Sequence, residues 1–433
     1  MANVQTRLVL REYGKPNDLR HDIGLAIGVD RDTADQILLD AGNRIALNMG
    51  LSYNPISIGV DGVKVVDVAG LIRLSPSLEL EIVPKFLDSN DPASTWREDF
   101  FYLSTLSQYG RLLPVEYLSS SGGTSRDLAA LVAHSIVGMY DSNKRRPLRT
   151  YRRIREYDFF LDGDIDPIDL IFPSADGFEQ ERLCFDKHNG WNADIVAAAR
   201  KLLPELRTPS VLGSLMRMIE DLSPQKSPAN RKKPIPSRHH AWKPLHQLSV
   251  DVLKGFGLNY QQNNMHAPGY MIVTWRVWED LLTVAARLGF GNPNVRSQRH
   301  FHLGNRINAN TRNTSTILVR PDCIIEADGA RPRFILDAKY KARVEKGGLH
   351  ISSNDIYEAL AFSKACKCDH VVLAYPALPA SKPPPIGSCV VFEEVIVGAV
   401  RIIGVHIEIR SVSKKGSINT FADNMKKTIT TIL

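Results

Sequence analysis

Two apolar runs separated by a turn stand out in the last third of the chain. Residues 316–343 read T-I-L-V-R-P-D-C-I-I-E-A-D-G-A-R-P-R-F-I-L-D-A-K-Y-K-A-R, with apolar runs at 317–319 and 334–336. Asp328-Gly329, between the runs, is a residue pair typical of tight hairpin turns. The pattern therefore predicts a β-hairpin in which the second strand rises into a charged segment.

The charged segment after the second run has a spacing that indicates chemistry. Successive side chains of a strand point to opposite faces, so Asp337, Lys339 and Lys341 are expected on one face. Burying a carboxylate beside an ammonium is costly unless the pair binds something. Together with Pro321-Asp322 before the turn, Asp337 and Lys339 complete the pattern Pro-Asp…Asp-x-Lys. The alternative interpretation is an exposed hairpin with a surface ion pair.

The residue types in this pattern suit metal-dependent cleavage of phosphodiesters. Carboxylate oxygens, here those of Asp322 and Asp337, are the ligands that Mg²⁺ prefers in proteins. A lysine at position 339 is suited to orient or deprotonate an attacking water, or to neutralise charge on the phosphate. The pattern Pro-Asp…Asp-x-Lys also resembles the PD-(D/E)xK nuclease signature, which makes the hairpin a candidate nuclease site.

Two predicted helices flank the hairpin and supply further polar candidates. Upstream, residues 271–286 are predicted to be helical because apolar residues recur at helical spacing, which leaves Glu279 able to point at the metal. Downstream, a helix is expected to begin at Asn354 as its cap. Its first turns carry the polar residues Asp355, Tyr357 and Glu358.

The rest of the chain predicts an α/β protein with several domains, because 433 residues exceed one typical core. Alternating residues 78–83 predict a sheet with one solvent-facing side. A helix over 242–257 is expected to pack beside the helix of Glu279. The predicted domains are a mixed α+β region at 1–118, a helical middle region at 119–222, a proline-rich basic linker at 223–238, and a mixed sheet flanked by helices at 239–433.

Composition narrows the class of protein without naming a function. A net charge of +7 is compatible with a polyanionic partner. Five cysteines are too few and too odd in number for a secreted disulfide framework, so a reducing cytoplasm is expected. The sequence has neither a signal-like start nor a long apolar run, which argues against secretion and membrane spanning. It also lacks a P-loop motif, so we expect no nucleotide bound by the chain itself.

Several of these segments together resemble a known family. They are Trp-Glu at 278–279, Arg-Pro-Asp at 320–322, Leu-Asp-Ala-Lys-Tyr-Lys at 336–341, Asp-Ile-Tyr-Glu-Ala-Leu-Ala-Phe at 355–362 and Val-Val-Leu-Ala-Tyr-Pro at 371–376. This set resembles McrC, the nuclease subunit of McrBC-type modification-dependent restriction systems, in the PD-(D/E)xK superfamily. The resemblance covers residues 270–376, and Pro84-Lys85 resembles the amino-terminal region more loosely. Glu358 stands where the family usually has Gln.

The resemblance implies a fold, a reaction and partners. It implies a restriction-endonuclease-like core within residues 239–433 and a Mg²⁺- or Mn²⁺-dependent endonuclease that hydrolyses double-stranded DNA in antiviral defence. Residues 1–118 would dock on a separate AAA+ GTPase or ATPase of the McrB type. Asp322, Asp337 and Glu279 would hold the metal and Lys339 would act on the water. Lys341, Asp355, Tyr357 and Glu358 would orient these groups or contact phosphate.

Two other functions fit the same sequence. The first is a catalytically inactive nuclease fold that binds DNA or regulates the motor. The second is a stand-alone restriction endonuclease that needs neither a motor nor a nucleotide.

Overall fold

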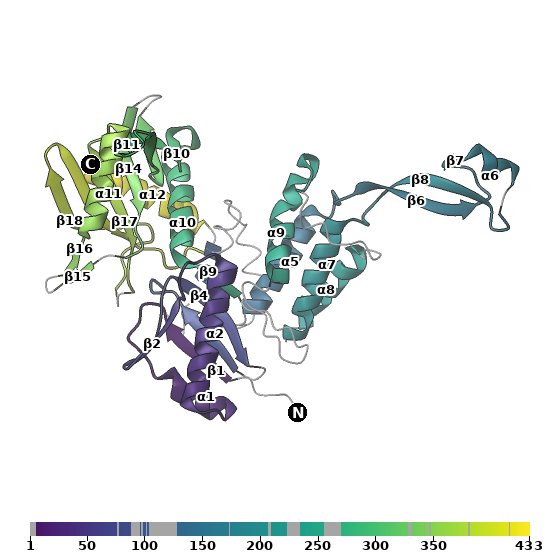
Figure 1. Ribbon diagram of the computed structural model, residues 1–433, viewed down its shortest axis with the longest axis horizontal. Helices are drawn as coiled ribbons and strands as arrows, with labels where there is room; N and C mark the ends of the chain where they lie inside the picture. Colours follow the sequence, from purple (N-terminus) through teal and green to yellow (C-terminus); the bar gives the residue numbers. More distant parts are fainter. Residues whose placement is uncertain are drawn as a thin grey trace. The chain divides into compact units, whose positions relative to one another are not determined.

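The structure of the protein is a computed structural model (Figure 1). Its main sheets are formed by strands from distant parts of the chain. The structure describes residues 6–75, 78–87, 96, 98–100, 102–103, 128–172, 174–206, 209–222, 234–254, 270–327, 331–341, 343–345, 348–379, 382–414 and 416–433. The chain divides into two compact units. The first comprises Met1–Gly122 and Gly269–Leu433, and the second comprises Gly123–Pro268.

This division differs from the predicted domains. The predicted boundary at 223–238 falls inside the second unit, and its residues 223–233 lie outside the described residues. Within the second unit, helix α9 (Lys243–Lys254) packs on α5 (Leu128–Asn143) and α7 (Gly190–Leu202). The helix of Glu279 belongs to the first unit, so the expectation that α9 packs beside it stays a prediction.

The largest sheet of the first unit has six strands. Their order is β10 (Val295–Ser297), β13 (Cys323–Ala327), β14 (Arg331–Ala338), β17 (His370–Pro376), β19 (Val400–Ile407) and β18 (Cys389–Val397). Strands β14, β17 and β19 run parallel, and the outer pairings are antiparallel. Parallel strands are usually buried on both faces, which explains the unbroken apolar run of β17.

Helices cover both faces of this sheet. Helix α11 (Ser353–Cys366) packs through Ala359 and Phe362 onto a core that includes Ile335 and Val371. Its cap is Ser352, two residues before the predicted Asn354. Helices α10 (Thr274–Phe290) and α12 (Ser417–Ile432) pack against each other (Figure 1). They cross closely at Gly289, where a Cβ atom would lie 2.9 Å from the carbonyl oxygen of Ala422.

A second sheet of the first unit combines three strands from the first 83 residues with one strand from residues 270–273. Its order is β1 (Thr6–Arg11), β5 (Leu78–Val83), β4 (Val68–Ser75) and β9 (Tyr270–Val273). The prediction of a helix from residue 271 is therefore wrong at its start, because residues 271–273 pair with β4 and α10 begins only at Thr274. Strand β9 thus leads directly from this sheet into the helix that carries Glu279.

The prediction of a solvent-facing side for residues 78–83 is also wrong. Glu79 and Glu81 are 4% and 0% exposed, so the side of β5 that carries them is covered rather than open to solvent. Arg7 on β1 offsets the burial of these charges, with its guanidinium 2.8 Å from Glu79 and 4.0 Å from Glu81. Alternation of charged and apolar residues here marks a buried ion-pair network rather than a wet face.

Further helices and hairpins complete the first unit. They are α1 (Leu19–Ile27), α2 (Arg31–Met49), η3 (Asn292–Asn294) and the hairpins β2 (Ile56–Gly59) with β3 (Gly62–Val65), β11 (Phe301–Ile307) with β12 (Thr314–Val319), and β15 (Arg343–Glu345) with β16 (Gly348–His350). Among the described residues, no helix is both long enough and apolar enough to cross a membrane.

The second unit is a helical bundle with a long hairpin. The hairpin joins β6 (Thr150–Asp158) to β8 (Phe178–Asp186), with β7 (Asp164–Ile165) and α6 (Pro167–Ile171) at its far end (Figure 1). The predicted helical middle region at 119–222 therefore contains strands as well as helices. The bundle contains α5, α7, α8 (Pro209–Leu222) and α9, together with the short helices η1 (Leu203–Glu205) and η2 (Ser237–Trp242).

Candidate active site

The predicted hairpin forms, with one change of partner. Strands β13 and β14 pair antiparallel, and the predicted turn at Asp328-Gly329 lies outside the described residues. Residues 317–319 belong instead to β12, which pairs with β11. Asp322 stands just before β13 and Asp337 near the end of β14. The antiparallel pairing therefore brings the two aspartates together at one edge of the six-stranded sheet.

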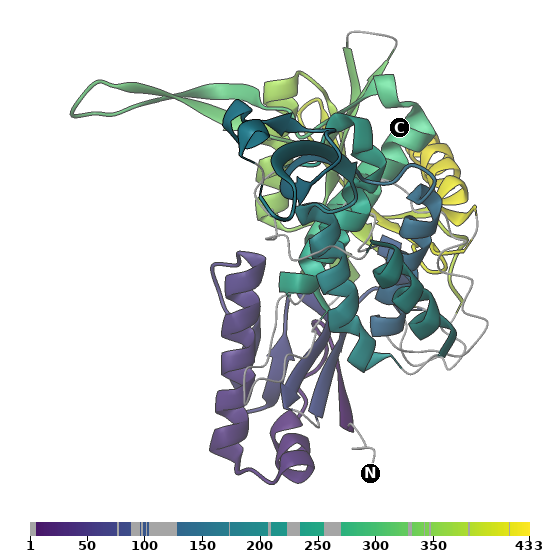
Figure 2. The same ribbon diagram turned by 90° about the vertical axis from the view of Figure 1, so that its right-hand side faces the viewer.

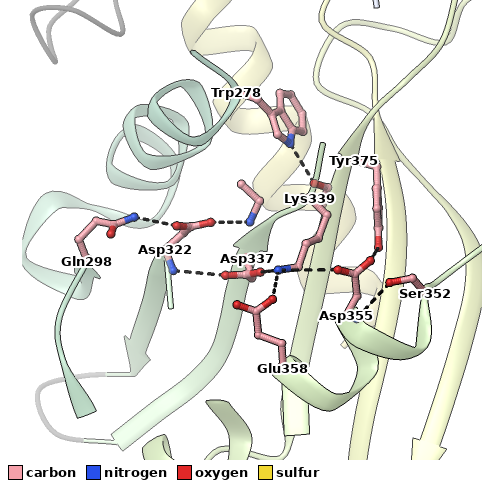
Figure 3. Close-up of polar contacts among 11 residues, drawn as sticks. Trp278, Gln298, Asp322, Asp337, Lys339, Ser352, Asp355, Glu358 and Tyr375 are labelled. Atoms are coloured by element: carbon pink, nitrogen blue, oxygen red, sulfur yellow. Dashed lines mark hydrogen bonds and ion pairs between the residues drawn. The ribbon is translucent and has the colours of Figure 1, made fainter. Parts of the chain in front are cut away.

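Asp322 is held by hydrogen bonds to both carboxylate oxygens (Figure 3). Its Oδ1 accepts from Nε2 of Gln298 at 2.7 Å, and its Oδ2 accepts from the backbone N–H of Ala338 at 2.8 Å. Burial raises the pKa of Asp322 despite these bonds, which favour the ionised form. The side chain is therefore fixed in position, and its negative charge is costly without a nearby cation.

Asp337 is the more deeply buried of the two aspartates. It is 3% exposed, and its Oδ1 lies 3.4 Å from the backbone N–H of Asp322, which donates to it. Its Oδ2 lies 2.8 Å from the ammonium of Lys339 but has no well-aligned hydrogen bond. Burial raises the pKa of Asp337 to about 7, and the charge of Asp322 adds to this effect.

Lys339 lies among three carboxylates (Figure 3). Its ammonium is 2.8 Å from Asp337, 2.6 Å from Glu358 and 4.0 Å from Asp355. Burial disfavours the ammonium, but the charges of Asp337 and Glu358 outweigh that effect and hold the pKa of Lys339 above its usual value. Lys339 therefore stays protonated at neutral pH, which makes it a source of positive charge rather than a base.

Glu279 lies near the two aspartates but does not join them in one compact group. The pKa of Glu279 is raised to about 8, mainly by burial. The negative charges of Asp322, Asp280 and Asp337 raise it further. Within the described residues, no group of three His, Cys, Asp or Glu side chains is arranged to hold a metal ion. The structure therefore brings together the pair Asp322 and Asp337, with Glu279 within electrostatic reach.

The donor set of this pair fits a hard divalent cation. Both aspartates are buried, both have a raised pKa, and one oxygen of Asp337 lacks a well-aligned hydrogen bond. A divalent ion bound by these oxygens would stabilise their ionised forms. Asp322 and Asp337 are the residues that would hold it.

The four secondary candidates separate into two groups. Asp355 and Glu358 lie beside Lys339, and Asp355 also accepts a hydrogen bond from the Tyr375 hydroxyl at 3.1 Å. Tyr357, in contrast, is 68% exposed. The expectation that Lys341 shares the face of Asp337 is wrong, because β14 ends at Ala338 and Lys341 pairs with Asp67 at 3.3 Å.

Sequence reasoning missed residues that support the site from other elements. Gln298, which contacts Asp322, lies outside every motif of the sequence. Trp278 donates from its indole N–H to the carbonyl of Ala374 at 2.9 Å and so ties α10 to β17 (Figure 3). The Trp-Glu pair at 278–279 was the only sequence signal for this contact.

A buried polar cluster connects the amino-terminal sheet to Tyr340, two residues past the end of β14. The carboxylate of Glu12 accepts from the hydroxyls of Thr274 and Tyr340, each at 2.6 Å, and from the backbone N–H of Lys85 at 3.2 Å. The Lys85 ammonium donates to the carbonyl of Tyr340. Glu12, Lys85 and Tyr340 line a cavity of about 550 Å³, and Tyr340 directly follows Lys339. The Pro84-Lys85 step therefore supports the candidate site.

This cluster predicts a pH dependence of stability. Burial raises the pKa of Glu12 from 4.5 to about 7, so the folded state binds this proton more tightly than the unfolded state. The stability from this group is fully present below about pH 4.5 and is lost as pH rises through about 7. Glu12→Gln, which mimics the protonated form, is expected to raise the free energy of unfolding at pH 8 by roughly 3 kcal/mol. Urea unfolding of the wild type and of Glu12→Gln at pH 5 and pH 8 measures this difference in the free energy of unfolding.

Glu220, an exposed residue on α8, provides the matched control. Glu220→Gln makes the same chemical change and should leave the pH dependence unchanged. An equal loss of stability between pH 5 and pH 8 in wild type and Glu12→Gln would contradict the assignment.

The fold and the candidate site together define the class of protein to which this chain belongs. A six-stranded mixed sheet with helices on both faces, and with Pro-Asp and Asp-x-Lys at the ends of adjacent strands, is a restriction-endonuclease-like core of the PD-(D/E)xK type. The sequence model described as "McrBC 5-methylcytosine restriction system component" matches residues 63–376, which is more than half of the chain. The chain belongs to this family, which confirms the resemblance found in the sequence.

One solved structure agrees with this fold, and a second was compared with it. The refined half-complex from a tetradecameric assembly of Thermococcus gammatolerans McrB AAA+ hexamers with bound McrC matches with a TM-score of 0.67 at 14% identity, over 99% of this chain and 100% of that chain. A cryo-EM structure of the Thermococcus gammatolerans McrBC complex has a TM-score of 0.44 at 14% identity, over 64% of this chain and 85% of that chain. No curated protein matches the sequence. The first match supports the whole fold, from the amino-terminal sheet to α12.

Proposed function

We propose that the chain is the Mg²⁺-dependent endonuclease subunit of an McrBC-type restriction system, and that it hydrolyses phosphodiester bonds in double-stranded DNA. The observation that carries this proposal is the pair of buried aspartates where β13 begins and β14 ends, with the Lys339 ammonium 2.8 Å from Asp337. Membership of a restriction-system family supports the same reaction. Mn²⁺ has the same preference for oxygen ligands and is expected to substitute for Mg²⁺.

Each residue of the site has a role that follows from its contacts. Asp322 and Asp337 would hold the divalent cation, which supplies Lewis-acid stabilisation of negative charge on the phosphate. Lys339 carries a positive charge that can neutralise a phosphate oxygen and orient the attacking water. Glu358 and Asp355 position the Lys339 ammonium, and Tyr375 in turn positions Asp355.

The partner is proposed to be an AAA+ protein of the McrB type, and the hairpin of the second unit offers a surface for it. Large apolar side chains at the hairpin end are mostly exposed, including Phe160 at 73%, Ile171 at 70% and Phe172 at 76%. A solvent-exposed apolar group of this kind usually marks a protein interface. We call residues 159–172 the hairpin tip and propose it as a docking surface, in addition to the predicted region 1–118.

Nicking of supercoiled plasmid DNA tests the proposed reaction. The purified chain is incubated with Mg²⁺, with Mn²⁺ or with EDTA, and each condition is repeated with the AAA+ partner and its nucleotide. Cleavage is expected with either metal in the presence of the partner, and none is expected in EDTA, because the aspartate pair then lacks its cation.

The same experiment separates the two alternatives. Cleavage by this chain alone, without partner or nucleotide, would identify a stand-alone restriction endonuclease. DNA binding without cleavage under every condition would identify an inactive nuclease-fold module, and the proposal of an endonuclease would then be wrong.

A further inference from the structure

The hairpin formed by β11 and β12 projects from the six-stranded sheet as a narrow two-stranded ribbon (Figure 2). At its base, Phe301 and Val319 lie opposite each other and pack against the core under α11. At its far end, the side chain of Asn308 accepts hydrogen bonds from the backbone N–H groups of Asn310 and Thr311. The ribbon is therefore anchored at one end and structured at the other. Six to seven residues per strand give it a length of roughly 20 Å.

The ribbon and its flanks carry positive charge only. Residues 292–321 contain no Asp or Glu, and they contain five arginines and two histidines. Arg299, Arg306, Arg312 and Arg320 are exposed, and none of them pairs with a carboxylate within the described part of the chain. Exposed guanidinium groups without carboxylate partners on a projecting element fit a polyanion.

The shape of the ribbon fits one particular polyanion. The major groove of B-form DNA admits a two-stranded β-ribbon. A β-bulge between His302 and Gly304 interrupts the ladder, and such bulges increase the local right-handed twist. Exposed side chains with donors and acceptors, such as Asn305 and Thr316, stand between the arginines and can reach base edges.

The base of the ribbon is bonded directly to a candidate metal ligand. Gln298, just before β11, bonds to Asp322 twice, through its backbone N–H at 3.0 Å and its side chain at 2.7 Å. At the other strand, Arg320 and Pro321 lead straight into Asp322. A nucleic acid held by the ribbon is therefore held at a fixed distance from the proposed cleavage site.

We propose that the β11–β12 ribbon enters the major groove of duplex DNA and places a phosphodiester at the site of Asp322 and Asp337. The ribbon's arginines contact phosphates on both sides of the groove, and its polar side chains face the base edges. This inference deepens the proposed nuclease function and rests on it for the identity of the site, but DNA binding by the ribbon is measurable without cleavage.

Fluorescence anisotropy with a short labelled duplex tests the ribbon in the full-length chain, with Ca²⁺ replacing Mg²⁺ to prevent cleavage. The double variant Arg306→Gln/Arg312→Gln is expected to bind roughly tenfold or more weakly at physiological salt. The slope of log K against log salt should fall by about 2, because two phosphate contacts are lost. Single-stranded DNA of the same length should show a smaller change, since it has no groove.

Lys426→Gln/Lys427→Gln, on the exposed side of α12, removes the same charge from another place and serves as the control. An Arg306→Gln/Arg312→Gln variant with wild-type affinity and salt slope would overturn the proposal, as would the absence of duplex binding by the wild type. An equal loss for single-stranded DNA would overturn the groove assignment. Ribbon-dependent binding without any cleavage would refute the nuclease function alone.

Discussion

Replacing Asp337 by Asn is expected to reduce DNA cleavage by about a thousandfold or more, without loss of fold. The variant removes a negative charge from the proposed cation site, and losses of this size are usual when a single group that stabilises a transition state is removed. The Asn side chain keeps the shape, and its carbonyl oxygen can still accept from the backbone N–H of Asp322. Single-turnover cleavage and thermal unfolding are the two measurements. Full cleavage activity in purified Asp337→Asn would refute the proposed site.

A matched pair of lysines gives this prediction its control. Lys339 lies beside Asp337 and Glu358, whereas Lys341, two residues further on, pairs with Asp67. Lys339→Met should lower cleavage by about a hundredfold or more, and Lys341→Met should stay within about tenfold of wild type. Similar losses in the two variants would point to a general charge effect along the segment rather than to a role of Lys339 at the phosphate.

Replacing Phe160 and Phe172 of the hairpin tip by Ser is expected to weaken binding to the AAA+ partner by about a hundredfold or more. Aromatic residues at the centre of an interface each contribute on the order of 2 kcal/mol or more, and each such loss is about 30-fold in affinity. Both side chains are more than 70% exposed, so their removal should not destabilise the chain itself. Analytical ultracentrifugation of the chain with a McrB-type partner from the same organism measures the complex.

Two exposed leucines of the amino-terminal region serve as the comparison. Leu25 and Leu47 are 75% and 84% exposed on α1 and α2. Leu25→Ser/Leu47→Ser should leave partner binding unchanged if the hairpin tip is the main contact. Loss of binding in this variant, with the tip variant unaffected, would place the docking surface in residues 1–118, as the sequence resemblance implied.

Local sequence patterns were sufficient to predict those features of the structure that depend on backbone geometry alone. The apolar run ending at Asp337 predicted strand β14. Lys339, one residue past the strand, keeps the same side as Asp337 because its backbone N–H still bonds to the carbonyl of Ala374 on β17. The prediction failed for Lys341, since the strand ends before it and alternation no longer applies.

Long-range partners were not predictable from local pattern. Residues 317–319 were assigned to the β13–β14 hairpin but pair with β11, and residues 271–273 looked helical but complete a sheet begun at residue 6. In each case an apolar run fits more than one buried setting, and the available partner strand selects among them. Gln298 became part of the site in the same way, through a fold that places it against Asp322.

The sequence by itself determined the chemistry of this protein: two aspartates and a lysine at the ends of apolar strands, a family resemblance around them, and a stretch of arginines with no acidic residue. Only the tertiary structure decided which charges are buried, that Lys339 stays protonated among three carboxylates, and that the ribbon base bonds to Asp322. The physical reason is that residue type and spacing are local properties. Burial and electrostatic environment, in contrast, depend on groups distant in the chain that folding brings together.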